Sequence, residues 1–173
     1  MTNRDFRLIE DDIAFAVRAS ALVIKDNRLL TIWAEQLGKY YLPGGAIRVG
    51  EDTSVALKRE LKEELGVDCQ VGNLAFVVEN PFELQDRFWH NIEFHYLVDI
   101  EGPLPEKVLE GCETRSLKWL PIDQLDRVDF KPTFLAQVLP NWTGSLQHIK
   151  SDYGRKATKT SESDIIAVST TDT

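Results

Sequence analysis

The chain has 173 residues, of which 43% are hydrophobic and 28% are charged, and its formal net charge at pH 7 is −8. This length and composition suit one soluble globular domain. The acidic charge argues against a general nucleic-acid binder or a protein of anionic membranes, because both need basic surfaces. No stretch is apolar enough to span a bilayer, and the acidic, polar start of the chain does not read as a signal peptide, so we expect a cytoplasmic protein.

The first part of the chain predicts two strands joined by a turn. Residues 13–24 are dense in Ala, Val, Ile and Leu, residues 25–27 have turn composition, and residues 28–33 are expected to return as a hairpin partner. Residues 42–45 read Leu-Pro-Gly-Gly, and the paired glycines allow the backbone to fold tightly there.

Residues 53–65 predict a helix with defined ends. They are mostly good helix formers, with Asp52 as the expected N-cap and Gly66 as the expected left-handed C-cap. At about 100° per residue, Leu57, Leu61 and Leu65 form a narrow apolar stripe.

The adjacent face of this helix carries three carboxylates. Glu60, Glu63 and Glu64 are spaced i, i+3 and i+4, which costs roughly a few tenths of a kcal/mol for each like-charged pair unless a cation neutralises them. Oxygen ligands of this kind select Mg²⁺ or Mn²⁺ over zinc, and no Cys/His cluster competes. The alternative is an ordinary solvated acidic face.

The second half of the chain predicts more strands, two short helices and a tail. From Ser151 onward the composition shifts to Ser, Thr, Lys and Asp, so we expect one domain over residues 1–150 and a mobile polar tail over residues 151–173. The two cysteines are expected to be free thiols. The other expected elements are strands at residues 69–78, 87–100 and 114–120, a loop at residues 102–111, and helices at residues 122–125 and 134–139, the last ended by Pro140.

The segment around the predicted helix follows a fixed template, G-x5-E-x7-R-E-U-x-E-E-x-G-U, in which U is aliphatic. It resembles the signature of the Nudix hydrolases, including their MutT-like and ADP-ribose pyrophosphatase-like members. The resemblance implies an α/β fold, an α/β/α sandwich with a mixed sheet between helices. It also implies metal-dependent hydrolysis of a phosphoanhydride bond in a nucleoside diphosphate linked to another group. The matching residues are Gly45, Glu51, Arg59, Glu60, Leu61, Glu63, Glu64, Gly66 and Val67.

The resemblance also implies roles for the residues of this box. Glu51 and Arg59 would form an ion pair that orients the carboxylates, and Gly44 would let the loop turn. Glu60 and Glu64 are the expected principal ligands of the metal, and Glu63 is a further ligand or the general base. The implied ligands of Mg²⁺ or Mn²⁺ are the carbonyl of Gly45 and the carboxylates of Glu60, Glu63 and Glu64.

Outside the box, a carboxylate from a later loop is expected to act as an additional ligand or base. Glu113 is the first candidate, because nucleotide-sanitising relatives have one such glutamate at this position. Many similar sequences have His-Glu-Ile where this chain has His-Asn-Ile at residues 90–92, so a carboxylate expected at Asn91 is missing. Glu93, on the same strand face, is its candidate replacement. The candidate catalytic residues are therefore Arg59, Glu60, Glu63 and Glu113.

A small nucleotide is the expected partner, and a second copy of the chain is a further candidate. ADP-ribose or a nucleotide sugar is preferred as substrate, because Pro81 lies near a position where ADP-ribose-cleaving relatives often have proline; oxidised nucleoside triphosphates come next. The alternative is a catalytically silent sensor with the same fold that binds a nucleotide and regulates a partner. Candidate substrate contacts, with packing as the alternative, are Arg18, Trp33, Tyr40, Phe82 and Glu93.

Overall fold

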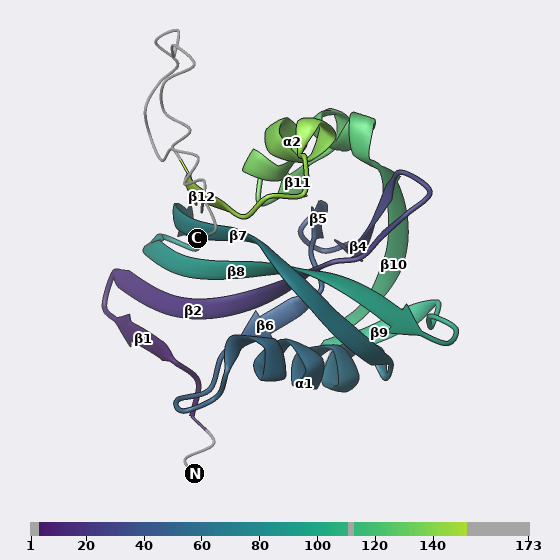
Figure 1. The fold of residues 1–173 in the computed structure, drawn as a ribbon. Coiled ribbons are helices and arrows are strands. Elements are labelled where there is room, and N and C mark those ends of the chain that lie inside the picture. Colours follow the sequence, from purple (N-terminus) through teal and green to yellow (C-terminus); the bar gives the residue numbers. More distant parts are fainter. Residues whose placement is uncertain (1–3, 111–112, 152–173) are drawn as a thin grey trace, which may run out of the picture.

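The computed structural model describes residues 4–110 and 113–151, and its strands form two sheets (Figure 1). The first sheet contains β1 (Arg7–Glu10), β2 (Ile13–Leu22), β6 (Gly44–Ala46), β7 (Asp68–Leu84), β8 (Arg87–Glu101) and β12 (Gln147–Lys150). The second contains β3 (Ile24–Lys25), β4 (Arg28–Ala34), β5 (Lys39–Tyr41), β9 (Lys107–Glu110), β10 (Glu113–Pro121) and β11 (Phe130–Lys131). The helical segments are α1 (Thr53–Leu65), η1 (Ile122–Arg127), α2 (Phe134–Val138) and η2 (Leu139–Asn141).

Both sheets are mixed, which confirms the predicted α/β class. The first has the order β1–β2–β8–β7–β12, with β6 paired to β2, and the second has the order β11–β5–β4–β10–β9, with β3 paired to β4. Strand β2 runs parallel to β8, while β7 and β8 form a long antiparallel hairpin. The strands are thus divided between two sheets, where the sequence predicted one sheet between helices.

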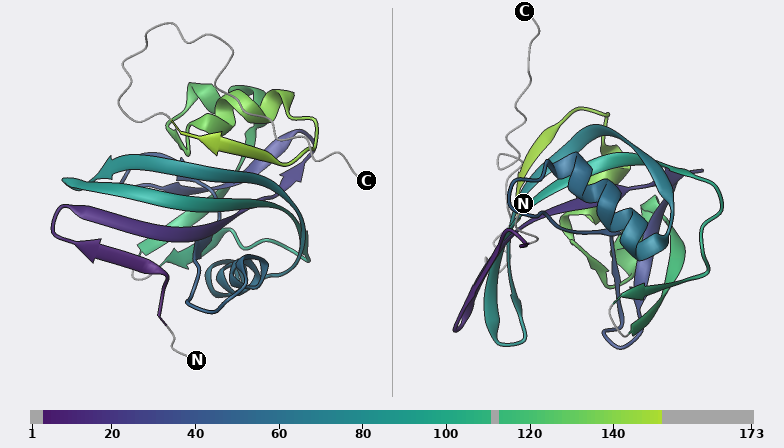
Figure 2. Two further views of the ribbon diagram at one scale, coloured as in Figure 1. Left: turned by 60° about the vertical axis from the view of Figure 1, so that its left-hand side comes forward. Right: turned by 90° about the horizontal axis from the view of Figure 1, so that it is seen from below.

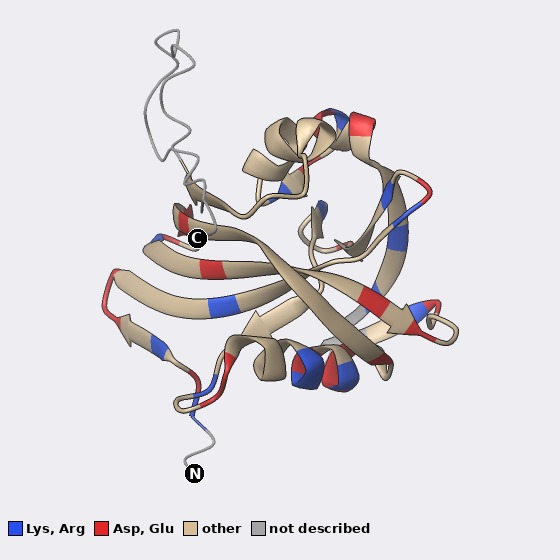
Figure 3. Ribbon diagram, viewed as in Figure 1, with Lys and Arg blue, Asp and Glu red and all other residues tan. Residues whose placement is uncertain are grey.

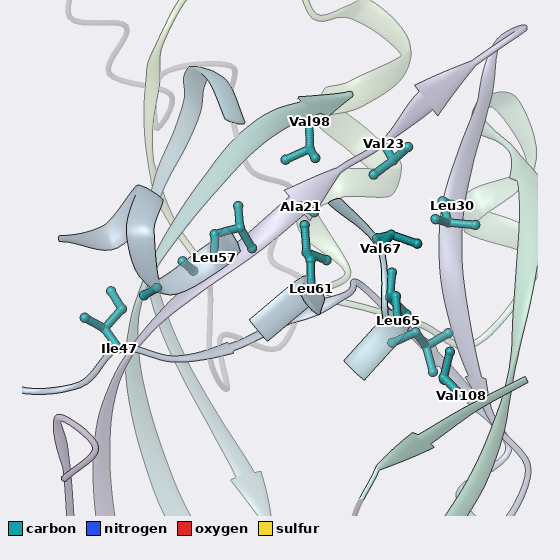
Figure 4. Packing of buried hydrophobic residues seen from close by; sticks show 13 residues of the cluster. Ala21, Val23, Leu30, Ile47, Leu57, Leu61, Leu65, Val67, Val98 and Val108 are labelled. Carbon is teal, nitrogen blue, oxygen red and sulfur yellow. The ribbon is translucent and has the colours of Figure 1, made fainter. Parts of the chain in front are cut away.

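Helix α1 has the predicted bounds and packs on β2, β6, β7 and β9. Its stripe of Leu57, Leu61 and Leu65 is buried in a cluster with side chains of β2, β4 and β8 (Figure 4). Gly66 ends the helix in the left-handed conformation, with φ of 70°, and its N–H donates to the Lys62 carbonyl. Asp52 occupies the N-cap position as predicted, and its side chain makes no capping hydrogen bond.

Strand β7 continues to Leu84, six residues beyond its predicted end at Val78. Asn80 and Pro81 are typical of the end of a strand, but β12 pairs with β7 only as far as Glu79, so no described strand pairs with the outer side of β7 at Pro81. Proline is tolerated there because no neighbouring strand needs its missing N–H.

Other bounds differ from the prediction for local reasons. Residues 13–24 do not form one strand, because β2 ends at Leu22 and the hairpin partner of β4 is the separate strand β3. The turn of that hairpin has positive φ at Asp26 and Asn27, as a tight two-residue turn requires. The predicted loop at 102–111 contains β9, and Pro140 lies inside the 3₁₀ turn η2 after α2 has ended at Val138.

The start of the described chain runs along the loop between β6 and α1. The Phe6 N–H donates to the Ile47 carbonyl at 2.6 Å, and the Val49 N–H donates to the Arg4 carbonyl at 2.9 Å. Strand β1 follows and pairs with β2, although the sequence predicted neither β1 nor β12. Within the described residues, no helix is long and apolar enough to cross a membrane. The predicted tail lies outside the described residues from 152 onward.

Candidate metal and active site

The glycine loop that precedes α1 leaves no room for side chains. Gly44 has φ of 135°, and a Cβ at this position would overlap the Ala19 carbonyl of the adjacent strand β2. At Gly45 an added Cβ would overlap the carboxyl group of Glu60. The two glycines therefore let β6 lie close to β2 on one side and to a helix carboxylate on the other.

A second carboxylate of α1 reaches the same loop. The Gly44 N–H donates to Oε2 of Glu64 at 3.4 Å, while Glu60, one helical turn earlier, lies against the backbone of Gly45. Residues four apart lie on the same face of a helix, which is why both side chains meet the loop. The structure thus brings Glu60 to Gly45 and Glu64 to Gly44 at the same loop.

Arg59 ties the loop to the helix. Its Nε and Nη2 atoms each lie 2.9 Å from a carboxylate oxygen of Glu51, and Nη2 also donates to the Ala46 carbonyl at 3.1 Å. The Arg59 and Glu51 side chains are only 16% and 15% exposed. The hydrogen bond from Arg59 lowers the pKa of Glu51 despite the opposing effect of burial, and the bond to Glu51 raises the pKa of Arg59. The expected ion pair is therefore present in bidentate form.

The same guanidinium contacts two further carboxylates. Arg59 Nη1 lies 2.6 Å from Glu60 Oε1 and 3.1 Å from Glu63 Oε2. Glu63 is half exposed, and its other oxygen lies 3.4 Å from Nη2 of Arg48, a contact that the sequence did not suggest. Basic and acidic residues are interspersed along the second half of α1 (Figure 3). Arg59 therefore neutralises part of the acidic face, and Glu63 is directed toward Arg48.

A buried polar cluster lies on the opposite side of the glycine loop. Arg18 of β2 donates from Nη2 to the Gly44 carbonyl at 3.4 Å, and Glu93 is its register partner on β8. Glu93 is 6% exposed and accepts hydrogen bonds from Asn80 at 2.9 Å and Asn91 at 3.2 Å. Its second oxygen lies 3.1 Å from Nε2 of the fully buried His95.

Comparison with known proteins supports one family. The NUDIX domain matches residues 14–142 of this chain, about three quarters of its length.

The chain belongs to the Nudix family.

Relatives of this Nudix hydrolase include enzymes that act on different nucleotides. The ADP-ribose pyrophosphatase of Methanocaldococcus jannaschii is 28% identical over 73% of this chain and 74% of the relative. The CTP pyrophosphohydrolase of Escherichia coli is 31% identical over 58% of this chain and 71% of the relative. Among solved structures, the MutT protein of Bacillus halodurans has a TM-score of 0.59 at 19% identity, covering 77% of this chain and 86% of its own, which shows the shared fold.

The Nudix loop and helix fit a hard cation by the chemistry of their donors. The groups that meet at the loop are the carboxylates of Glu60 and Glu64 and the backbone of Gly45, and oxygen atoms are the ligands that Mg²⁺ and Mn²⁺ prefer. No group of three or more His, Cys, Asp or Glu side chains is already arranged around a common point within the described residues. Arg59 lies between Glu60 and Glu63 instead.

The candidates outside the Nudix box are not gathered in one place. Trp33 and Tyr40 lie together in the second sheet, with ring centroids 4.5 Å apart. Phe82 instead stacks on Trp89 across the β7–β8 hairpin, with centroids 6.1 Å apart. Glu113 begins β10, but its side chain lies outside those that the structure describes, so its proposed role stays a prediction.

The environment of Glu93 makes it a poor general base. Burial acts to raise its pKa, but the hydrogen bonds from His95 and Asn80, with the charge of Arg18, outweigh burial and lower the pKa to about 2. A base works best with a pKa near the operating pH. The sequence did not predict this cluster, because polar residues at every second position of β8 are equally typical of a solvated sheet face.

This cluster predicts a specific pH dependence of stability. The pKa of Glu93 falls from its usual 4.5 to about 2 on folding, so the carboxylate stabilises the folded protein above pH 4.5, and this contribution is lost as the pH falls toward 2. We expect the Glu93→Gln variant to lack this component. Wild type should lose about 2 kcal/mol more than the variant between pH 5 and pH 3, measured by urea unfolding.

The control for this measurement is Glu35→Gln, which removes one carboxylate from the exposed turn between β4 and β5. Its free energy of unfolding should follow the wild-type curve. Parallel curves for wild type and Glu93→Gln would show that Glu93 titrates alike in the folded and unfolded chains.

Proposed function

We propose that this protein uses Mg²⁺ or Mn²⁺ to hydrolyse the phosphoanhydride bond of a nucleoside diphosphate linked to another group. The observation that carries the proposal is the meeting of Glu60 and Glu64 at the glycine loop, where the space of a missing Cβ at Gly45 is filled by the Glu60 carboxyl group. Like-charged side chains four residues apart destabilise a helix, so their placement at one loop is explained by a cation.

Different residues of the chain have different roles in this reaction. Glu60, Glu64 and the Gly45 carbonyl would hold the cation, and the bidentate pair of Arg59 and Glu51 fixes the helix against the loop. When bound, the cation neutralises charge on the anhydride oxygens, which otherwise repel a nucleophile. The oxygen of a water molecule forms a new bond to phosphorus, the anhydride P–O bond breaks, and a carboxylate takes the proton of the water.

Glu113 and Glu63 are the two candidates for this carboxylate, and we expect Glu113 to be the base. Glu113→Gln should then lower kcat by about 10²–10⁴-fold with little change in metal affinity, because a positioned base acts on the proton transfer alone. Glu63→Gln should have a smaller effect on kcat. The measurement is steady-state kinetics at saturating Mg²⁺.

A ligand and a base respond differently to excess metal. If Glu113 is a ligand, a high concentration of Mn²⁺ should rescue part of the loss in Glu113→Gln, whereas a base variant should stay slow. A wild-type rate for Glu113→Gln, together with a large loss for Glu63→Gln, would transfer the role of base to Glu63.

ADP-ribose or a nucleotide sugar is the proposed substrate, and the similarity to an ADP-ribose pyrophosphatase supports this choice. The similarity to a CTP pyrophosphohydrolase supports nucleoside triphosphates as the alternative class. The two classes give different products, which are two phosphate monoesters from ADP-ribose and one monoester with pyrophosphate from a triphosphate.

A substrate panel with Mg²⁺ tests the proposed function. Release of phosphate after coupling to alkaline phosphatase reports cleavage of ADP-ribose and nucleotide sugars, because the intact diesters resist that enzyme. Inorganic pyrophosphatase reports cleavage of CTP and oxidised nucleoside triphosphates. Binding of a nucleotide without turnover of any compound would contradict the proposal and favour the silent sensor.

A further inference from the structure

Large exposed hydrophobic side chains are concentrated at one end of the first sheet. Eleven such residues occur in the described part of the chain, and six of them lie in β1 or immediately before it, at the first residue of β2 or at the tip of the β7–β8 hairpin, with exposed fractions of 38–50%. Exposed apolar patches of this kind mark sites of association. We call this region the hairpin surface, formed by Phe6, Leu8, Ile9, Ile13, Leu84 and Phe88.

Most of the hairpin surface lies on one face of the sheet. Ile13 is directly opposite Phe88 in the β2–β8 register, and Leu8 is opposite Phe15 in the β1–β2 register. The ring of Phe6 meets that of Phe15 edge to face, with centroids 6.2 Å apart. Residues opposite each other or two apart on a strand share a face, so these side chains form one apolar patch. This patch lies at the ends of the β1–β2 and β7–β8 hairpins, which extend beyond α1 (Figure 2).

The outer edge of β1, which no other described strand pairs with, belongs to the same region. Strand β1 is the end strand of the first sheet, it pairs with β2, and all four of its residues are exposed. Ile9 is exposed on the face opposite Leu8, because neighbouring residues of a strand point to opposite faces. A partner that adds a strand to this edge would cover apolar side chains on both faces at once.

The charges along this edge fit a second copy of the same chain. Arg4 and Arg7 lie at the start of the edge, with Asp5 between them at 3.8 Å from Arg7, so the start is basic by one charge. Glu10, Asp11 and Asp12 lie at its end, and all six of these residues are exposed (Figure 3). A two-fold axis through an antiparallel pair of β1 strands places the basic start of each strand beside the acidic end of the other. Such an edge is complementary to itself, as the interface of a symmetric dimer must be.

We propose that the protein forms a two-fold dimer in which β1 pairs antiparallel with β1 of a second copy and the hairpin surfaces pack around this joint. The first sheets of the two copies then become one continuous sheet. This inference does not depend on the proposed hydrolysis, because none of the residues of the hairpin surface belongs to the metal loop or to α1.

The first test compares two leucines of similar exposure. Leu8 is 50% exposed on β1, and Leu37 is 48% exposed in the turn between β4 and β5. Sedimentation analysis over a wide range of protein concentration should show a dimer for wild type and for Leu37→Glu. Leu8→Glu should weaken the dimer by about tenfold or more in dissociation constant, because it places a charge in the apolar joint of both copies.

A charge exchange makes the test independent of any loss of folding. Arg7→Glu alone and Glu10→Arg alone should each weaken the dimer, because each reduces the difference in charge between the basic start of one β1 strand and the acidic end of the other. The double variant R7E/E10R restores opposite charges at both ends and should recover the wild-type dissociation constant. A mixture of the two single variants should form a heterodimer.

Three results would overturn the proposal. These are a monomer at every concentration of wild type, equal effects of Leu8→Glu and Leu37→Glu, and a double variant that is weaker than both single variants. Thermal unfolding of each variant would confirm that it is folded before sedimentation.

Discussion

Glu64→Gln is expected to lower kcat by about 10³-fold at saturating Mg²⁺ while the fold is retained. The Gly44 N–H donates to Oε2 of Glu64, and a glutamine oxygen can still accept that hydrogen bond. The variant loses one negative charge at the proposed cation site. We expect the bound metal to stabilise the transition state less well as a result, at a cost of several kcal/mol. Steady-state kinetics with the substrate found in the panel would measure the loss.

Thermal unfolding separates this role from a structural one. Mg²⁺ should raise the melting temperature of the wild type, because it binds the folded state alone, and the increase should be much smaller for Glu64→Gln. The matched control is again Glu35→Gln, which should behave as the wild type in both experiments. An equal Mg²⁺-dependent increase for wild type and Glu64→Gln would remove Glu64 from the ligand set.

Gly45→Ala is the second substitution with a large expected effect. The added methyl group would overlap the carboxyl group of Glu60. Because this group is the end of a flexible side chain, while β6 and the leucine stripe of α1 are buried, we expect the Glu60 side chain to turn away. A displacement of about 1 Å at a reacting site costs on the order of 10²-fold in rate. We expect that loss in kcat, together with a weaker Mg²⁺ response in thermal unfolding.

Gly50→Ala, in the segment between β6 and α1, is the control for this substitution. No atom lies within 4 Å of a Cβ at Gly50, but the φ of 84° is unfavourable for alanine. This variant should therefore lose roughly 1–2 kcal/mol of stability without a change in metal response. If Gly45→Ala shows only a loss of stability of similar size, the close contact between Gly45 and Glu60 has no part in metal binding.

The sequence was most informative where local rules decide the structure. Gly66 fixes the end of α1, the leucines at every fourth position fix its buried face, and this geometry places Glu60 and Glu64 on the side that meets the glycine loop. These features depend on neighbours within one or two helical turns. The spacing of the box therefore predicted that Glu60 and Glu64 share one side of α1, while Glu63 is directed toward Arg48.

The parts that the sequence did not predict depend on distant neighbours. Pro81 reads as the end of a strand, yet β7 tolerates it because β12 has already stopped pairing two residues earlier. The sequence could not predict the contacts of Glu93 for a similar reason. Its donor Asn80 comes from β7, and His95 is buried between Phe76 and Phe134, which are far apart in the sequence.

The hydrogen bonds between the start of the chain and the loop at residues 47–49 bear on how the protein should be prepared. Phe6 is bonded to Ile47, and Arg4 is bonded to Val49, two residues before Glu51. An affinity tag fused ahead of residue 1 would be tethered next to this loop and next to the edge of β1. Kinetic constants and association constants should therefore be measured after the tag has been cleaved, and a difference between tagged and cleaved protein would report the coupling between the N-terminal segment and the loop.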